Sequence, residues 1–359
     1  MKLTAVIQLL PTEEQRRTLY ETLQTLNAAC NAISQQAWES KTFRRVPLHH
    51  LVYYSVREQF GLTAQMTVRC IGKVTDAYKI NRKTRHNFRK HGAIPYDLQM
   101  IRYDLEQQSV NLQTLDKRQT VPFAAGKHQL ELLPYQRGES DLFERRGKFY
   151  IAATCDIPDD APFDPDEFLG VDLGIKNIAT DSDGKIHSAI QLLNVRYRHR
   201  RLRRNLQPKT TWSSYRKLKT LSGKERRFAR DVNHCISKQI VTIAKDTGRG
   251  IALEDLKGIR DRVTFSRKQR NNLHSWSFYQ LRQFVEYKAQ RAGVPVVCVD
   301  PRNTSRECSV CGCVDKRNRK TQASFSCTSC GFAAHADVNA AVVIGSRAVV
   351  NPPNADGFH

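Results

Sequence analysis

Hydrophobic and polar positions divide the first part of the chain into a strand, a helical stretch and a series of short alternating segments. Residues 3–10 have the pattern of a short strand, and Thr12 with Gln15 forms the Thr-x-x-Gln signal that opens a helix. Apolar side chains then recur with helical spacing at Leu19, Leu23, Leu26, Cys30 and Ile33. Helical, basic sequence continues to about residue 87, and alternating segments such as 129–132 and 148–152 follow, separated by Gly and Pro. These patterns predict a small β domain with a helical insertion after its first strand.

A second domain is predicted after an acidic, Pro-rich linker at residues 158–165, where Pro removes the backbone donors that a regular ladder needs. Strand patterns at 168–174 and 178–180 precede Asp183 and Gly184, which form a hairpin-turn signal. An amphipathic helix over 228–243 leads to a strand at 250–253, and a helix at 278–291 leads to a strand at 294–299. Strands that alternate with helices in this way predict an α/β sheet.

Composition and charge narrow the class of protein. The chain has 359 residues, of which 40% are hydrophobic, enough for more than one domain with a buried core. Its 58 Lys and Arg residues against 35 Asp and Glu residues give a net charge of +23, which is too basic for an ordinary metabolic enzyme and predicts a polyanionic partner. No apolar run approaches the roughly 18 residues of a membrane span, and residues 1–10 are too short and polar for a signal peptide. We therefore expect a cytoplasmic protein.

The C-terminal part of the chain contains a zinc-binding pattern. Cys308 and Cys311 are followed, after fifteen residues, by Cys327 and Cys330, which is the spacing of a zinc ribbon. Cys313 is interpreted as a spectator, because a closed zinc site needs only four ligands. We predict a structural zinc ion, and we expect Cys327→Ser to lower stability by loosening this module without altering the candidate active-site carboxylates. The loop between the pairs either touches phosphate or is simply solvated; it contains Lys316, Arg317, Arg319 and Lys320.

Three carboxylates occupy positions that an active site would need. Asp172 falls in the first strand of the second domain, Glu254 ends a later strand, and Asp337 opens a helix after the zinc pattern. If the strands are adjacent, the three acids come within reach of shared cations, and hard oxygen ligands favour Mg²⁺ or Mn²⁺. Taken singly, each acid is also explained as a surface or capping group. Asp183 fits the turn, and Asp255 is expected to point away from Glu254.

A run of a single charge sign precedes the amphipathic helix. Between residues 196 and 230 there are many Lys and Arg residues and a single acid, Glu225, whereas ordinary solvated surfaces mix both signs of charge. We predict that the run contacts nucleic-acid phosphates through Arg196, Arg198, Arg200, Arg201, Arg203, Arg204, Lys209, Arg216 and Lys217. The interleaved Tyr197, Trp212 and Tyr215 either stack on bases or pack against neighbouring side chains. A second basic segment is expected to form a lid over the carboxylates; it contains Arg260, Arg262, Arg267, Lys268, Arg270 and Trp276.

In their order and spacing, these motifs resemble the TnpB family over about residues 168–345. The matching segments are Gly-Val-Asp-Leu-Gly-Ile-Lys at 170–176, Ala-Leu-Glu-Asp-Leu at 252–256, Asn-Thr-Ser at 303–305 before the cysteine pairs, and Asp-x-Asn-Ala-Ala at 337–341. That family comprises transposon-encoded RNA-guided DNA endonucleases related to the compact type V CRISPR effectors. The N-terminal half is similar mainly in layout.

The resemblance implies an α/β multidomain fold. A RuvC-like nuclease domain of the RNase H fold would span residues 166–303 and 332–359, with an inserted zinc ribbon at 304–331. A small β-barrel, or wedge, domain would span 1–10 and 95–165, interrupted by a helical recognition lobe at 11–94.

The resemblance also implies a chemistry and partners. Asp172, Glu254 and Asp337 would be catalytic and bind two Mg²⁺ ions, with Asp172 bridging them, for two-metal hydrolysis of a phosphodiester. The partners would be a guide RNA and a target double-stranded DNA with a short adjacent motif, with no membrane involved, so the protein would be nucleoid-associated when on DNA.

Two other functions stay open. One is a catalytically silent RNA-guided DNA-binding regulator, against which the intact carboxylate set argues. The other is a transposase that joins DNA strands with a similar acidic triad. Copurifying RNA separates the RNA-guided functions from the transposase, and a magnesium-dependent nick separates the nuclease from the regulator.

Overall fold

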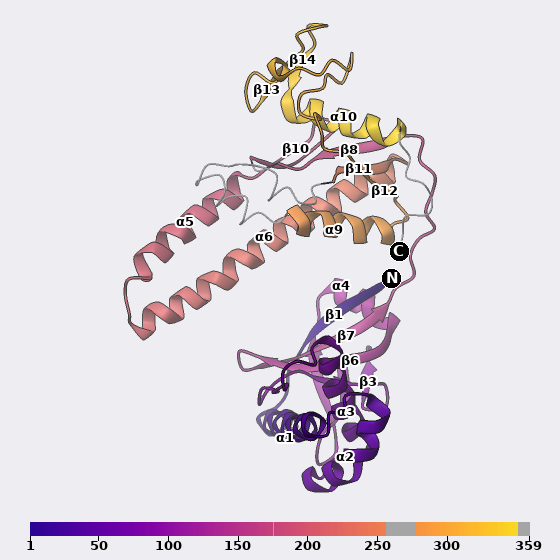
Figure 1. Ribbon diagram of the computed structural model, residues 1–359, viewed down its shortest axis with the longest axis vertical. Coiled ribbons are helices and arrows are strands. Elements are labelled where there is room, and N and C mark those ends of the chain that lie inside the picture. Colours follow the sequence, from indigo (N-terminus) through magenta and orange to yellow (C-terminus); the bar gives the residue numbers. More distant parts are fainter. Residues whose placement is uncertain (175, 256–277, 351–359) are drawn as a thin grey trace. The chain divides into compact units, whose positions relative to one another are not determined.

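The computed structural model describes residues 1–174, 176–255 and 278–350, and the chain forms two compact units, Met1–Pro158 and Asp159–His359 (Figure 1). Both units mix helices and sheets. In the parts of the chain that are described, no helix is both long and apolar enough to cross a membrane.

The N-terminal unit contains a seven-stranded antiparallel sheet with the order β2-β6-β7-β1-β5-β4-β3. Its strands are β1 (Lys2–Leu9), β2 (Ile94–Tyr96), β3 (Ile101–Asp104), β4 (Ser109–Gln113), β5 (Arg118–Ala124), β6 (Gln136–Arg145) and β7 (Lys148–Asp156). The strands predicted over residues 3–10 and 148–152 correspond to β1 and β7. In β1, Ala5, Ile7 and Leu9 are buried, which is the period of two expected of a strand with one face in the core.

The alternating pattern at 129–132 predicts an extended segment, but these residues belong to helix α4 (Lys127–Leu132). Its two leucines stand only two positions apart, and so short a run fits a single helical turn as well as a strand. A short 3-10 helix, Leu133–Tyr135, carries on the turn to β6.

Three helices lie between β1 and β2 in the chain: α1 (Glu13–Glu39), α2 (Arg45–Phe60) and α3 (Ala64–Ile80). The predicted cap of α1 is present, since Thr12 and Gln15 each accept a hydrogen bond from the other's backbone N–H, at 3.3 and 3.1 Å. The five apolar residues predicted to form its buried stripe are fully buried. The helices and the sheet share one hydrophobic core. The helical stretch ends at Ile80 rather than near residue 87, because Asn81 is extended and its Oδ1 accepts the N–H of Lys83.

The C-terminal unit is built on a five-stranded sheet with the order β10-β9-β8-β11-β12. Its strands are β8 (Phe168–Asp172), β9 (Asn177–Asp181), β10 (Ile186–Ser188), β11 (Gly250–Glu254) and β12 (Val296–Val299). The pairings of β8 with β9 and of β9 with β10 are antiparallel, whereas β8, β11 and β12 run parallel. The α/β sheet and the hairpin predicted from the sequence are thus present.

Helices cover this sheet on both sides (Figure 1). α10 (Ala336–Val350) packs on β8, β11 and β12, while α6 (Trp212–Asp246) and α9 (Phe278–Arg291) contact β11 and β12 from the other side. The run of basic residues forms a helical hairpin of α5 (Ile190–Leu206) and the first half of α6. A small module between β12 and α10 holds a 3-10 helix, Lys316–Asn318, and the strand pair β13 (Ser324–Ser326) and β14 (Ala333–His335).

Candidate active site and zinc-binding module

The three predicted carboxylates meet at one edge of the C-terminal sheet. Asp172 ends β8 and Glu254 ends β11, and these strands are parallel neighbours in which Val171 lies opposite Leu253. The two acids therefore lie at the same end of the sheet, where the C-terminal ends of β8 and β11 are side by side. Asp337 lies in the first turn of α10, the helix that packs directly on β8.

A glycine allows α10 to come this close. A Cβ atom on Gly170 would stand 1.9 Å from the carbonyl oxygen of Ala341, far inside van der Waals contact. The absence of a side chain at Gly170 lets the backbone of α10 lie against β8. This contact brings Asp337 to the edge where Asp172 and Glu254 end.

The carboxylates influence one another electrostatically. The pKa of Asp172 is raised to about 8, first because of burial and then because of the negative charges of Glu254 and Asp337. Burial also raises the pKa of Glu254. Bound cations would stabilise the ionised forms of these neighbouring carboxylates. Carboxylate oxygens are also the ligands that Mg²⁺ prefers. The residues present therefore fit such a cation.

Each of two carboxylates is held by partners from other elements. Oδ2 of Asp337 accepts a hydrogen bond from Nδ2 of Asn177 on β9, and Oδ1 accepts one from Nη2 of Arg319, both at 2.9 Å. Oε1 of Glu254 lies 2.5 Å from the hydroxyl of Thr304. Asp337 is 5% exposed, so its two hydrogen bonds are largely shielded from water.

Two acids that are close in sequence to the site residues, Asp255 and Asp183, form ion pairs with arginines. Asp255 forms an ion pair with Arg282 of α9 at 3.0 Å. Asp183, in the turn after β9, pairs with Arg249 at 2.5 Å. These contacts agree with the expectation that neither acid belongs to the site.

The four predicted zinc ligands form one cluster. Among the described residues, Cys308, Cys311, Cys327 and Cys330 are the one group of three or more Cys, His, Asp or Glu residues placed to hold a metal ion, and their ligand atoms all lie within 4.8 Å of one another. The three carboxylates, all of them described, do not form such a group. Cys313 is outside the cluster, and its carbonyl oxygen accepts the N–H of Cys308 at 3.0 Å.

The second cysteine pair has the hydrogen bonds that a thiolate needs. The backbone N–H groups of Ser329 and Cys330 point at Sγ of Cys327, at 3.4 and 3.5 Å. The bond from Cys330 is the main reason that the pKa of Cys327 falls to about 6. Four convergent sulfur ligands of this kind suit Zn²⁺.

The basic hairpin divides into buried and exposed residues. Arg196 is 7% exposed and lies 4.0 Å from Glu225, and Arg203 lies 2.6 Å from the same carboxylate. His199 is also buried, 3.8 Å from Glu225. Arg196, which is buried, and Arg203, which is half-buried, thus join α5 to α6 through Glu225.

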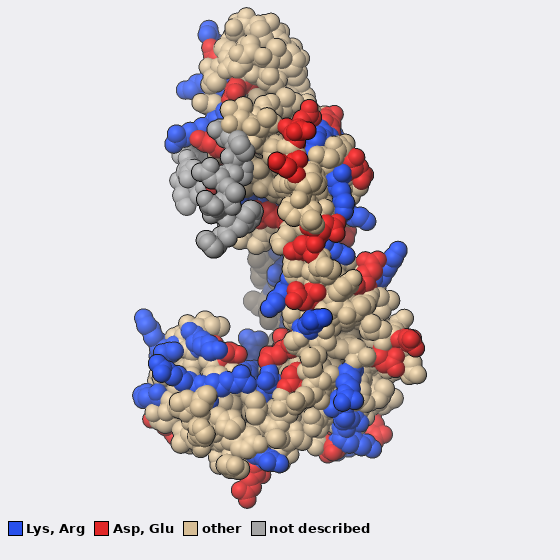
Figure 2. Space-filling model, turned by 90° about the vertical axis from the view of Figure 1, so that its right-hand side faces the viewer, with Lys and Arg blue, Asp and Glu red and all other residues tan. Residues whose placement is uncertain are grey.

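The other predicted nucleic-acid contacts are exposed, namely Arg198, Arg200, Arg201, Arg204, Lys209, Arg216 and Lys217. Trp212, Tyr215 and Tyr197 are exposed as well, at 80%, 58% and 45%, so their rings are available to a ligand. On the face drawn in Figure 2, Lys and Arg side chains gather at the lower left, and elsewhere they lie among Asp and Glu side chains. The predicted lid, with Arg260, Arg262, Arg267, Lys268, Arg270 and Trp276, lies outside the described residues.

Sequence reasoning misses three residues of the site: Asn177, Thr304 and Arg319. Asn177 carries no signal in the sequence that distinguishes it from a strand-end asparagine. Thr304 belongs to the Asn-Thr-Ser segment, but the segment by itself indicates no role for it. Arg319 is predicted only as part of a basic loop, whereas it reaches the carboxylate of Asp337.

Two family models and several curated proteins match parts of this chain. The model of the Cas12f1-like TNB domain matches residues 278–344, and the model OrfB_IS605, described as "Probable transposase", matches residues 153–258. The CRISPR-associated endodeoxyribonuclease Cas12f1 of Sulfoacidibacillus thermotolerans is 32% identical over 234 residues, which are 58% of this chain and 52% of that protein. A TnpB-like protein of Methanocaldococcus jannaschii is 33% identical over 187 residues, or 48% of this chain and 66% of that protein.

The fold has a solved counterpart. A cryo-EM structure of a Cas12f1–sgRNA–target DNA complex matches with a TM-score of 0.58 at 15% identity, over 90% of this chain and 82% of that chain. The chain spans about half the length of the Cas12f1 relatives that it matches in sequence. The two family models and these relatives show that the chain is similar to TnpB-like proteins and to Cas12f1 endodeoxyribonucleases.

Proposed function

We propose that this protein is an RNA-guided DNA endonuclease, and that Asp172, Glu254 and Asp337 are its catalytic residues. The observation that carries the proposal is the meeting of these acids from β8, β11 and α10, close enough that Glu254 and Asp337 raise the pKa of Asp172. The relatives named as endodeoxyribonucleases support the reaction class.

The three carboxylates would hold two Mg²⁺ ions. Such ions supply activation of a water molecule and stabilisation of the leaving 3′-oxygen in phosphodiester hydrolysis. Asp172 lies near both other acids, whose negative charges raise its pKa, and it would hold the cations together with them. Asn177 orients Asp337 through Oδ2. Arg319 brings a positive charge to the same carboxylate, where a phosphate group of the substrate would also arrive.

The domain assignment is part of the proposal. A RuvC-like nuclease domain of the RNase H fold at residues 166–303 and 332–359 is supported by the mixed five-stranded sheet with acids at the ends of β8 and β11. A zinc ribbon at 304–331 is supported by the cysteine cluster, which would hold one structural zinc ion. A wedge domain at 1–10 and 95–165 and a helical lobe at 11–94 are supported by three helices placed between β1 and β2.

The partners follow from charge and exposure. A guide RNA and target double-stranded DNA would contact the exposed arginines of α5 and the exposed basic residues that follow, which lie on a hairpin with a single acid. In such a complex base pairing reads the sequence, and the protein holds the backbone. The structure of the Cas12f1–sgRNA–target DNA complex shares the fold of this chain.

The test begins with sequencing RNA that copurifies with the protein, which supplies the guide. A duplex that matches the guide should be cut with Mg²⁺ and left intact with EDTA. Asp172→Ala, Glu254→Ala and Asp337→Ala should each abolish cleavage and preserve binding, since the geometry and charge of a two-metal site are lost together. The matched controls Asp183→Ala and Asp255→Ala should retain most activity.

Three results would reject the proposal. Cleavage in EDTA, or by Asp172→Ala, contradicts a metal site built on this residue. Binding without cleavage by the unaltered protein favours the silent regulator. Strand joining without copurifying RNA favours the transposase.

A further inference from the structure

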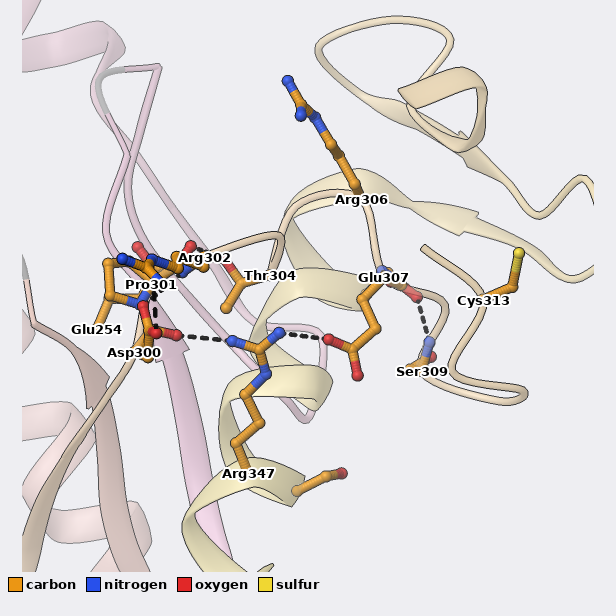
Figure 3. Close-up of polar contacts among 12 residues, drawn as sticks. Glu254, Asp300, Pro301, Arg302, Thr304, Arg306, Glu307, Ser309, Cys313 and Arg347 are labelled. Atoms are coloured by element: carbon orange, nitrogen blue, oxygen red, sulfur yellow. Dashed lines mark hydrogen bonds and ion pairs between the residues drawn. The ribbon is translucent and has the colours of Figure 1, made fainter. Parts of the chain in front are cut away.

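We infer that Thr304 is a positioning residue of the carboxylate site, which fixes the orientation of Glu254 and ties this acid to the zinc-binding module. The inference rests on the proposed function, because it treats Glu254 as a cation ligand. Its evidence is a separate set of contacts, which lie between the end of β12 and the first zinc cysteine (Figure 3).

The hydroxyl of Thr304 has two acceptors within reach. Its Oγ1 lies 2.5 Å from Oε1 of Glu254 and 3.1 Å from the carbonyl oxygen of Pro301. A hydroxyl carries one hydrogen, and an ionised carboxylate at the shorter distance is the stronger acceptor. Thr304 therefore donates to Glu254 when this acid is charged. The two residues are 3% and 9% exposed, so water does not readily replace the bond.

The hydrogen bond leaves one carboxylate oxygen for another ligand. Oε2 of Glu254 receives no hydrogen bond from the residues that the structure describes. Because Oε1 is fixed by Thr304, rotation of the carboxylate is restricted and the direction of Oε2 is set. Neutral donors that orient a metal ligand in this manner raise the affinity of a site by holding its geometry.

The position of Thr304 is itself held by a turn. Asn303 adopts a left-handed backbone with φ of 62°, and its carbonyl oxygen accepts the N–H groups of Arg306 and Glu307 at 2.8 and 2.9 Å. A left-handed asparagine stabilised by two backbone bonds makes this turn well defined. The segment cannot shift Thr304 without breaking them.

Contacts with α10 attach the same turn to the module. Arg347 donates to Glu307 and to the carbonyl oxygen of Asp300, as Figure 3 shows. Asn339 donates to the carbonyl oxygen of Glu307 and accepts the N–H of Ser309, at 2.7 and 3.0 Å. Ser309 directly follows Cys308, so the path from the cysteine cluster to Glu254 is short and hydrogen-bonded throughout.

The experiment measures cation binding in the zinc-loaded full chain. Mn²⁺ is titrated and followed by electron paramagnetic resonance, beside elemental zinc analysis and thermal unfolding. Thr304→Val keeps the shape and removes the hydroxyl, so it should weaken Mn²⁺ binding by about 10-fold or more, with zinc content unchanged. Thr304→Ser keeps the hydroxyl and should bind as the unaltered protein does. The matched control is Thr328→Val, which removes a threonine hydroxyl bonded to Asn318 within the zinc module and should not change Mn²⁺ binding.

Glu254→Gln separates this inference from the proposed function. If Glu254→Gln weakens Mn²⁺ binding and Thr304→Val does not, the role of Thr304 is rejected and the proposed site stands. If neither change affects Mn²⁺ binding, both fail. Should Thr304→Val lose zinc or fail to fold, Thr304→Ala is measured in its place against Thr304→Ser, and equal affinity in that pair also overturns the inference.

Discussion

Arg319, in the loop between the two cysteine pairs, donates a hydrogen bond to Asp337, the carboxylate contributed by α10, with 2.9 Å between Nη2 and Oδ1. The side chains are 22% and 8% exposed, so the ion pair is mostly withdrawn from water. Nη2 of Arg319 also donates to the carbonyl oxygen of Gln322, which restrains the guanidinium. The module that contains the cysteine cluster is therefore in direct contact with the candidate carboxylate site.

The contact predicts a role for Arg319 in cleavage. Arg319→Ala should reduce the cleavage rate on the order of 100-fold, because a preorganised positive charge beside the reacting phosphate would be removed. Arg317→Ala is the matched control, since Arg317 lies in the same loop but pairs with Asp315 and is 79% exposed. The measurement is single-turnover cleavage with zinc content determined for both variants. Equal rates in the two variants would show that Arg319 only stabilises the loop.

The same contact changes the expected effect of zinc loss. From the sequence, Cys327→Ser is expected to loosen the module and leave the three carboxylates unaltered. Because the module supplies Arg319, and because Thr304 stands just before its first cysteine, the structure instead predicts that zinc loss disturbs Asp337 and Glu254.

Cys327→Ser should therefore lose the bound zinc and reduce cleavage by about 10-fold or more. Elemental analysis and cleavage are measured on the same preparation, with Cys313→Ser as the control because Cys313 is outside the cluster. Full activity in zinc-free protein would contradict the coupling, and zinc-free unaltered protein would contradict the zinc site itself.

Local patterns suffice for much of the fold. The buried stripe of α1, the Thr12 cap and the strands β8, β11 and β12 follow from periodicity and capping, which depend on residues close together in the chain. Where the local signal is short it misleads, as at Gln129–Leu132, because a few alternating residues do not distinguish a strand from one helical turn.

Contacts between distant residues are beyond such reasoning. The carboxylates are identifiable by type and position, but Asn177 and Thr304 donate to acids 160 and 50 residues away, and nothing local marks them. The burial of Arg196 is likewise not predictable from local sequence, because it depends on Glu225, which α6 places beside it. Which charges face water depends on how the hairpin closes.

Glu225 is predicted to hold the hairpin together. It is the partner of Arg196, His199 and Arg203 from α5, and its side chain is 17% exposed. Glu225→Gln keeps the shape but leaves the buried Arg196 without its carboxylate, which should cost about 3 kcal/mol. Hydrogen exchange in α5 and in the N-terminal half of α6 should then accelerate roughly 100-fold. Asp160→Asn removes a half-exposed partner of Lys245 and should leave exchange in the hairpin unchanged. If hydrogen exchange in the hairpin is unchanged in Glu225→Gln, packing alone holds α5 against α6.

The division of the hairpin sharpens the prediction for RNA binding. The exposed residues Arg198, Arg200, Arg201 and Arg204 are free to meet phosphates, whereas Arg203 is engaged by Glu225. Each phosphate bound on single-stranded RNA releases counterions, so the logarithm of affinity falls with the logarithm of salt concentration by about 0.7 per phosphate. Replacing the four exposed arginines by Ala should flatten that slope by about 0.7 for each phosphate that the variant no longer binds.

Arg203→Ala is the comparison, because it removes a charge from the same helix. It should weaken the hairpin through Glu225 and change the salt slope little. The slopes are measured with the copurified RNA by fluorescence anisotropy over a series of KCl concentrations. A slope that the fourfold variant leaves unchanged would mean that the exposed face of α5 is solvated and that RNA binds elsewhere. A slope that Arg203→Ala flattens as strongly would mean that Glu225 releases its arginine when RNA binds.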